Sequence, residues 1–222
     1  MPEGIQTLGT GGNIRSEGEF NRVRWQIRNM LGTYVVPFTS AAGTKMPLSY
    51  APVVAGSSEA TASVCFSTFN HASQGIPLAD AWNNDLYRPS DVTHMNSYNA
   101  PSVPNSQNAV DRFWIIDPGV AGYAYGTRPS IALGFTYDPG VVVGEVTAGN
   151  AIGPLDPVGA QRFNNAAGIW GDYLPSGTWA GGLPSSVVTA TASPADFFRS
   201  WTLANILEPL PVRLVHFAST CE

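Results

Sequence analysis

The stretch Pro129-Ser130-Ile131-Ala132-Leu133-Gly134-Phe135-Thr136-Tyr137-Asp138 decides the fold class of this 222-residue chain. Every second side chain in it is large and apolar, and the side chains between them are small. A period of two is typical of a β-strand with one buried face, whereas a helix repeats its apolar positions every three to four residues. The residues that we expect on the buried face are Ile131, Leu133, Phe135 and Tyr137.

Similar short segments recur along the chain and are separated by turns rich in Gly and Pro. Roughly a dozen short strands with such spacing indicate an all-β fold, a β-sandwich or a jelly-roll-like arrangement with very little helix. Only residues 194–198 and 203–207 favour a turn or two of helix. The further strand candidates are residues 20–28, 33–38, 48–54, 61–69, 111–117, 141–146, a hairpin over 161–170, and residues 187–192, 197–203 and 211–217.

Three parts of the chain differ in pattern. Residues 1–19 hold five glycines and predict a flexible N-terminal arm. Residues 20–208 predict the β-sandwich domain, either one unit or two packed sub-sandwiches. Within it, residues 70–110 show no periodicity, so we expect either a long functional surface loop or short strands that the pattern hides. Residues 209–222 predict a terminal strand and a linker.

The charge content is unusually low. Asp, Glu, Lys and Arg make up 12% of the chain, against roughly 25% in an ordinary soluble domain. The net charge is −5 and no basic stripe exists, which argues against a nucleic-acid partner. No stretch of 18 apolar residues occurs, so the sequence predicts no membrane-spanning segment.

Four groups of segments carry a resemblance to known proteins: residues 25–27 with 32–38, 110–117 with 129–138, 161–164 with Trp170, and 198–203 with 209–217. These segments resemble one family, the β-rich secreted and surface proteins of Bacteroidota that the type IX secretion system exports. The resemblance implies an extracellular or cell-surface location and leaves the activity open. In those proteins a sorting domain follows the last of these segments; this chain stops at Glu222, so we expect a processed or shortened form.

Groups for catalysis are few. The three histidines are His71, His94 and His216, and the first two lie in the 70–110 loop with several Asp and Ser residues. No Gly-x-Ser-x-Gly or His-Glu-x-x-His motif accompanies them. We therefore expect that the protein is not an enzyme and has no catalytic residue. A hydrolase with its active site in the 70–110 loop is a minor alternative.

We expect no cofactor and no metal ion. A calcium site near Asp80 and Asp85 is a minor alternative. Calcium binds several oxygen ligands from such loops, but a turn built by Asx hydrogen bonds explains the same residues. Cys65 lies in an apolar run, which favours a buried thiol. Whether it pairs with Cys221 stays open.

Aromatic residues offer a candidate ligand surface. Trp82 and Tyr87 in the long loop and Trp179 near a hairpin turn are candidates for stacking on sugar rings. The competing interpretation is that they pack in the core of the sandwich.

We expect a structural or adhesive surface protein that self-associates into an oligomer, polymer or filament. Charged side chains normally guard strand edges against pairing between molecules, and this chain has few of them. The N-terminal arm is expected to add a strand to a neighbouring subunit through Ile5, Leu8 and Ile14. The alternative function is a carbohydrate-binding module of a secreted polysaccharide-degrading system, with a glycan as partner.

Overall fold

The computed structural model describes residues 13–40, 42–58, 60–96, 102–140, 144–146, 149–171, 174, 176–180, 184–189, 191–208 and 210. Strands dominate this part of the chain, and its helices are single 3-10 turns, so the all-β fold is confirmed. None of its helices is long and apolar enough to cross a membrane.

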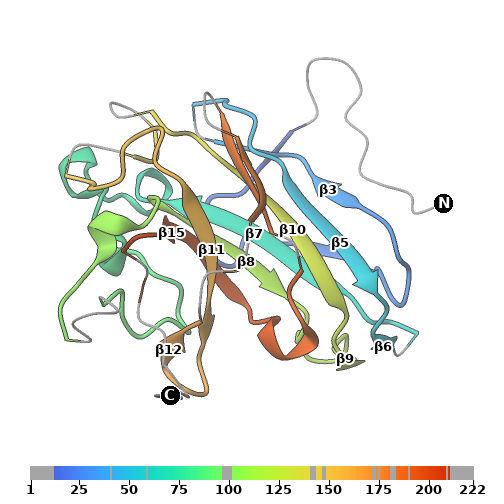
Figure 1. The fold of residues 1–222 in the computed structure, drawn as a ribbon. Coiled ribbons are helices and arrows are strands. Elements are labelled where there is room, and N and C mark those ends of the chain that lie inside the picture. The colour runs from blue at the N-terminus through green and yellow to red at the C-terminus, as the bar shows by residue number, and fades with distance from the viewer. Residues whose placement is uncertain are drawn as a thin grey trace, which may run out of the picture.

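Two antiparallel sheets form the sandwich (Figure 1). One sheet has five strands in the order β13-β14-β10-β5-β3, and the other has six in the order β12-β11-β15-β8-β7-β2. The five-stranded sheet contains β13 (Ser176–Ala180), β14 (Ser185–Thr189), β10 (Ser130–Tyr137), β5 (Leu48–Val54) and β3 (Tyr34–Val36). The six-stranded sheet contains β12 (Ile169–Trp170), β11 (Val158–Asn164), β15 (Ser200–Asn205), β8 (Arg112–Asp117), β7 (Val64–Asn70) and β2 (Val23–Trp25).

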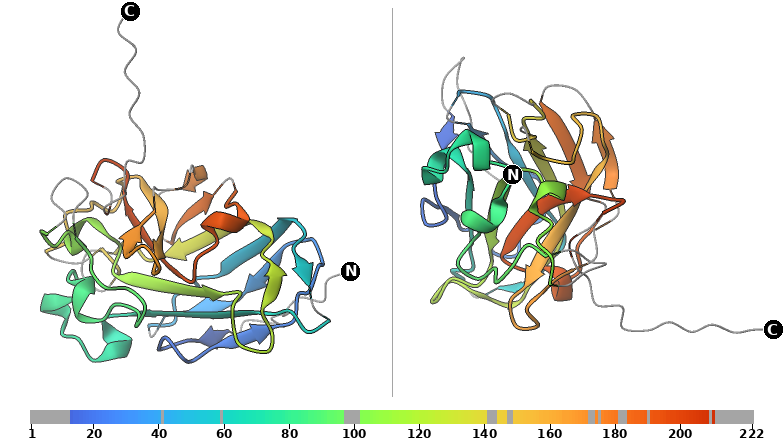
Figure 2. Two further views of the ribbon diagram at one scale, coloured as in Figure 1. Left: turned by 90° about the horizontal axis from the view of Figure 1, so that it is seen from below. Right: turned by 90° about the vertical axis from the view of Figure 1, so that its left-hand side faces the viewer.

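Smaller elements complete the fold. β1 (Ile14–Arg15) pairs in parallel with β4 (Phe38–Thr39), and β6 (Ser57–Ser58) pairs antiparallel with β9 (Tyr125–Thr127). Most of the 3-10 turns lie in the 70–110 segment, which gathers at the left of Figure 1 and of the left view of Figure 2. These turns are η1 (Ala72–Gln74), η2 (Leu78–Asp80), η3 (Asn84–Leu86), η4 (Ser106–Asn108) and, later in the chain, η5 (Pro194–Asp196).

The main core lies between the two sheets. The four alternating residues Ile131, Leu133, Phe135 and Tyr137 of β10 are all buried, as predicted. The ring of Phe135 meets Trp114 of β8 edge to face at 5.2 Å between centroids, which joins one sheet to the other. Burial of large aromatic side chains is the main favourable term that holds such a sandwich together.

A second hydrophobic cluster covers the opposite face of the six-stranded sheet. Phe113 and Ile115 of β8 point into it, while Trp114 and Ile116 of the same strand point into the main core. Tyr87 and Met95 of the 70–110 segment pack on this face. Both faces of β8 are therefore buried, which explains why its sequence is apolar at consecutive positions.

Some predicted elements need correction. The hairpin over 161–170 is confirmed by pairing of Phe163 with Trp170 and by Gly168, whose φ of 64° suits a tight turn. Residues 144–146 of the predicted strand 141–146 form a bend instead, because Glu145 turns inward to meet an arginine. Residues 203–205 belong to β15 rather than to a helix. The predicted strand 211–217 lies outside the described residues.

Candidate functional site

The outer face of the five-stranded sheet is uncharged. No Asp, Glu, Lys or Arg occurs in any of its five strands. On β3, β5 and β10 the side chains opposite the core are small or β-branched, and Val35 and Val53 are 42% and 46% exposed. We call this surface the neutral face; its described members are Val35, Ser49, Ala51, Val53, Ser130, Ala132, Gly134 and Thr136, the last of which is buried.

Register aligns these residues across neighbouring strands. Ala51 lies opposite Ala132, and Ser49 lies between Val35 on one side and Gly134 on the other. Paired residues of an antiparallel sheet point to the same face, so the small side chains form continuous rows. Among the described side chains that β3, β5 and β10 place on this face, none is long, so this part of the face does not keep another sheet at a distance.

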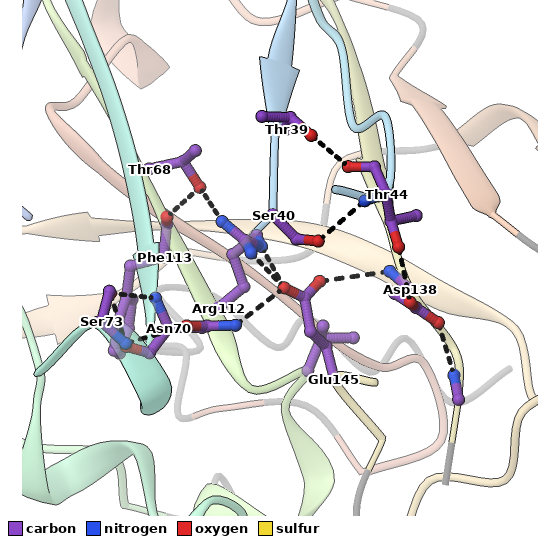
Figure 3. A network of polar contacts seen from close by, with 12 residues as sticks. Thr39, Ser40, Thr44, Thr68, Asn70, Ser73, Arg112, Phe113, Asp138 and Glu145 are labelled. Atoms are coloured by element: carbon purple, nitrogen blue, oxygen red, sulfur yellow. Dashed lines mark hydrogen bonds and ion pairs between the residues drawn. The ribbon is translucent and has the colours of Figure 1, made fainter. Parts of the chain in front are cut away.

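A buried ion pair lies where β8 begins (Figure 3). Arg112 at the start of β8 and Glu145 form a salt bridge, and their side chains are only 3% and 2% exposed. Arg112 also donates to the hydroxyl of Thr68 at 2.8 Å, and Asn70 donates to Glu145 Oε1 at 3.3 Å. The second oxygen of Glu145 accepts the backbone N–H of Asp138 at 3.2 Å. Such saturation compensates for the desolvation of two charges.

A cavity of about 260 Å³ adjoins this ion pair. His71, Asn70, Asp138 and Glu145 line it, and Nδ1 of His71 is buried without a hydrogen-bond partner in the part of the chain that the structure describes. Burial, together with the nearby charge of Arg112, lowers the pKa of His71, so the imidazole is neutral. The carboxylates of this site are already engaged, Glu145 by the contacts above and Asp138 by Gly140 and Thr44. The arrangement braces the fold and offers no aligned acid and base.

A second ionic cluster surrounds Arg199 just before β15. Its guanidinium contacts Glu19, Asp91 and Asp117, and Ser90 donates its hydroxyl to Glu19 at 2.6 Å. Burial by itself raises the pKa of Glu19, but the hydrogen bonds from Ser90 and Arg199 outweigh it, so the pKa falls below its ordinary 4.5. This cluster fastens the N-terminal segment and the 70–110 segment to the six-stranded sheet.

The predicted stacking residues have different fates. Tyr87 is wrong as a ligand residue, because it is 6% exposed, donates to the carbonyl of Ala81 and packs against Phe113. Trp82 is partly exposed, but Gly149 lies so close that a Cβ there would meet the indole at 2.5 Å. One side of the Trp82 ring is therefore covered by its own chain. The side chain of Trp179 lies outside the described residues.

The predicted N-terminal arm needs correction at its C-terminal end. Ile14 pairs with Phe38 of the same chain and packs against the main core. Ser16 accepts the N–H of Thr68 at 3.0 Å, and Ser67 donates to the carbonyl of Glu19. Residues 13–19 thus belong to the domain because their backbone groups find partners in it. Ile5 and Leu8 lie outside the described residues.

The candidate catalytic and calcium residues do not converge. His94 accepts the N–H of Asn96 on Nδ1, so Nε2 donates to the carbonyl of Gly168, and both ring nitrogens serve the fold. Asp85 forms an ion pair with Arg88 at 3.1 Å, and Asp80 lies on a different 3-10 turn. The described ranges contain no group of three or more His, Cys, Asp or Glu side chains suited to a metal. Cys65 is buried and free, and burial raises the pKa of its thiol; Cys221 lies outside these ranges.

Comparison with known proteins gives no relative. No protein-family model, no curated protein and no solved structure matches the chain. The neutral face is the feature that sequence reasoning missed. The sequence does contain a sign of this face, the small residues between the apolar positions of β10. These residues indicate a continuous surface only when β5 and β3 are known to lie beside β10.

Proposed function

We propose that this protein is a structural subunit that self-associates through the neutral face of its five-stranded sheet. The observation that carries the proposal is the complete lack of charged residues in the five strands. Charged residues are depleted in the cores of protein–protein interfaces, so an uncharged sheet face suits contact with another molecule.

A second copy of the chain is the occupant that fits this face best. Two neutral faces meet without desolvating an unpaired charge, a cost that a charged partner would incur. Small side chains in rows, such as Ser49, Ala51 and Ala132, allow sheets to approach to about 10 Å, the usual spacing of stacked sheets. Exposed valines, including Val35 and Val53, supply apolar area for burial.

An extracellular or cell-surface assembly, or an adhesive layer, is the setting that we infer. Support for it comes from the sequence resemblance to exported β-rich proteins and from the low charge content of 12%. Neither Ile14 nor the rest of residues 13–19 is available to reach a neighbour, so the proposal places association on the sheet.

Charge placed on the neutral face tests the proposal. We expect the intact chain to associate with rising concentration in light scattering, and we expect Ala132→Glu or Ala132→Lys to abolish association. An equimolar mixture of the two variants should recover part of it if the face meets itself. Leu207→Glu is the matched control, because Leu207 is 78% exposed and lies outside both sheets. A monomeric intact chain, or equal association of Ala132→Glu and the intact chain, would overturn the proposal.

A further inference from the structure

A small cup lies beyond the ionic cluster, at the edge of the six-stranded sheet. Arg24 of β2 and Gln26 form one side of it, Thr61 and Ser63 lie just before β7, and Tyr123 precedes β9. The cup has a volume of about 230 Å³ and is separate from the neutral face. Its polar groups are not used by the proposed assembly.

The side chain of Arg24 stacks on an aromatic ring and forms no ion pair with a described carboxylate. Its guanidinium lies over the ring of Tyr123 at 4.0 Å from the centroid, a cation–π contact that fixes the plane of the fork. It has no ion pair or hydrogen bond within the described part of the chain. The contrast is with six other arginines, each of which contacts a carboxylate: Arg15, Arg22, Arg88, Arg112, Arg162 and Arg199. Arg28 and Arg128 also contact no carboxylate in the described ranges, but neither of them lines the cup, and Arg128 donates to the carbonyl of Phe197. Arg24 differs from both in that it stacks on an aromatic ring and lines a cavity.

Ser63 provides the second observation. Its side chain is 1% exposed and lines the cup, and its hydroxyl has no hydrogen-bond partner among the described residues. Its backbone N–H donates to the backbone carbonyl of Tyr123 at 2.9 Å, which joins the two segments that line the cup. A buried hydroxyl without a partner costs free energy, so a water or a ligand in the cup would gain a hydrogen bond there.

The other two lining groups suit hydroxyls. Gln26 donates to the carbonyl of Ala60 at 3.0 Å, which leaves its own carbonyl oxygen available as an acceptor. Thr61 contacts the carbonyl of Gly122 only at 3.5 Å, so its hydroxyl is weakly engaged. The cup thus combines one planar cationic fork with neutral donors and acceptors.

We propose that this cup binds the carboxylate of an acidic sugar, a uronate. The guanidinium fork matches a planar carboxylate in a bidentate contact, and the Ser63, Thr61 and Gln26 groups match the neighbouring sugar hydroxyls. A phosphate-rich ligand fits less well, because a single unpaired arginine on a chain of net charge −5 gives little phosphate neutralisation.

Titration of the full chain with galacturonate, followed by NMR chemical shifts of the tryptophan and backbone amides, tests the proposal. We expect saturable shifts for Ser63 and Tyr123, weaker binding of galactose, which lacks the carboxylate, and weaker binding of acetate, which lacks the hydroxyls. Tetragalacturonate should bind through the same residues. Galactose or acetate binding as tightly as galacturonate would overturn the assignment.

Variants distinguish binding in the cup from a general attraction between the protein's positive charges and the carboxylate. Arg24→Gln should weaken galacturonate binding about tenfold or more, and Ser63→Ala should weaken it less. Arg28→Gln is the matched control, because it removes the same charge four positions away and Arg28 does not line the cup. Equal losses for Arg24→Gln and Arg28→Gln would contradict a built site. This cup and the neutral face lie on different sheets. A monomeric protein that still binds galacturonate would therefore refute the proposed self-association and leave the proposed uronate site intact.

Discussion

The outer faces of the two sheets differ in whether the chain itself covers them. The six-stranded sheet is covered by its own chain, through the second hydrophobic cluster around Phe113 and the ionic cluster around Arg199. The five-stranded sheet carries no charge in its strands and presents the neutral face. The difference teaches that the two sheets handle charge differently. On the six-stranded sheet, charged side chains such as Asp117 and Arg199 are engaged in ion pairs under the covering chain. The strands of the five-stranded sheet contain no charged residue, although Val35 and Val53 are exposed.

The largest expected effect comes from the covered face. Phe113→Ala removes a fully buried ring that contacts Phe69 and Tyr87, and it should lower the free energy of unfolding by about 3–5 kcal/mol in urea denaturation. Val53→Ala on the neutral face is the control and should change it by less than about 0.5 kcal/mol. Similar losses for the two variants would remove the distinction between the sheets.

Variants of the buried ion pair test the role of Arg112, the one charged side chain that β8 directs between the sheets. Arg112→Met should lower the free energy of unfolding by about 3 kcal/mol, because it leaves Glu145 buried without its cation. The double variant Arg112→Met with Glu145→Met should recover most of this loss, since two apolar side chains leave no unpaired charge. A double variant as unstable as the single one would indicate that shape, rather than charge, matters at this position.

The ionic cluster should make the covering of the six-stranded sheet sensitive to acid. The pKa of Glu19 is lowered in the folded state, so its contribution is complete above its ordinary 4.5 and is lost as the pH falls through the lowered value. Arg199→Met should cost about 1.5–3 kcal/mol near neutral pH. Urea denaturation repeated near pH 3 should give a smaller difference between the variant and the intact chain. A difference independent of pH would contradict this role of Glu19.

The smallest effect is expected at the edge of the neutral face. Val35→Lys on β3 introduces a charge at a side chain that is 42% exposed, so the free energy of unfolding should change by less than about 0.5 kcal/mol. A thermal or urea transition of the purified variant measures it. A loss above about 1 kcal/mol would mean that the chain covers this face as it covers the other.

The sequence predicted what depends on local periodicity. The alternation over 130–137 predicted β10 and its buried face correctly, and the pattern over 161–170 predicted the hairpin. The 70–110 segment gave no such signal, because its order depends on side-chain contacts such as Asn84 Nδ2 donating to the carbonyl of Val110 at 2.8 Å. Those contacts have no period in sequence.

The candidate sites were harder to predict for a related reason. Arg112 and Glu145 are 33 positions apart, and Arg24 meets Tyr123 although the strands β3 to β8 lie between them in the sequence. Tyr87 was a reasonable stacking candidate until the fold placed it under Phe113. Pairings across sheets follow from topology, which short-range patterns do not contain.

The position of β15 affects how the chain reaches this structure. It is the last described strand, yet it lies between β11 and β8 in the middle of its sheet (Figure 1). A nascent chain that emerges N-terminus first therefore has two half-sheets without their shared neighbour, and Glu19 waits for an arginine 180 positions away. Folding with such distant contacts is slow, so we expect the sandwich to close only after β15 has been synthesised.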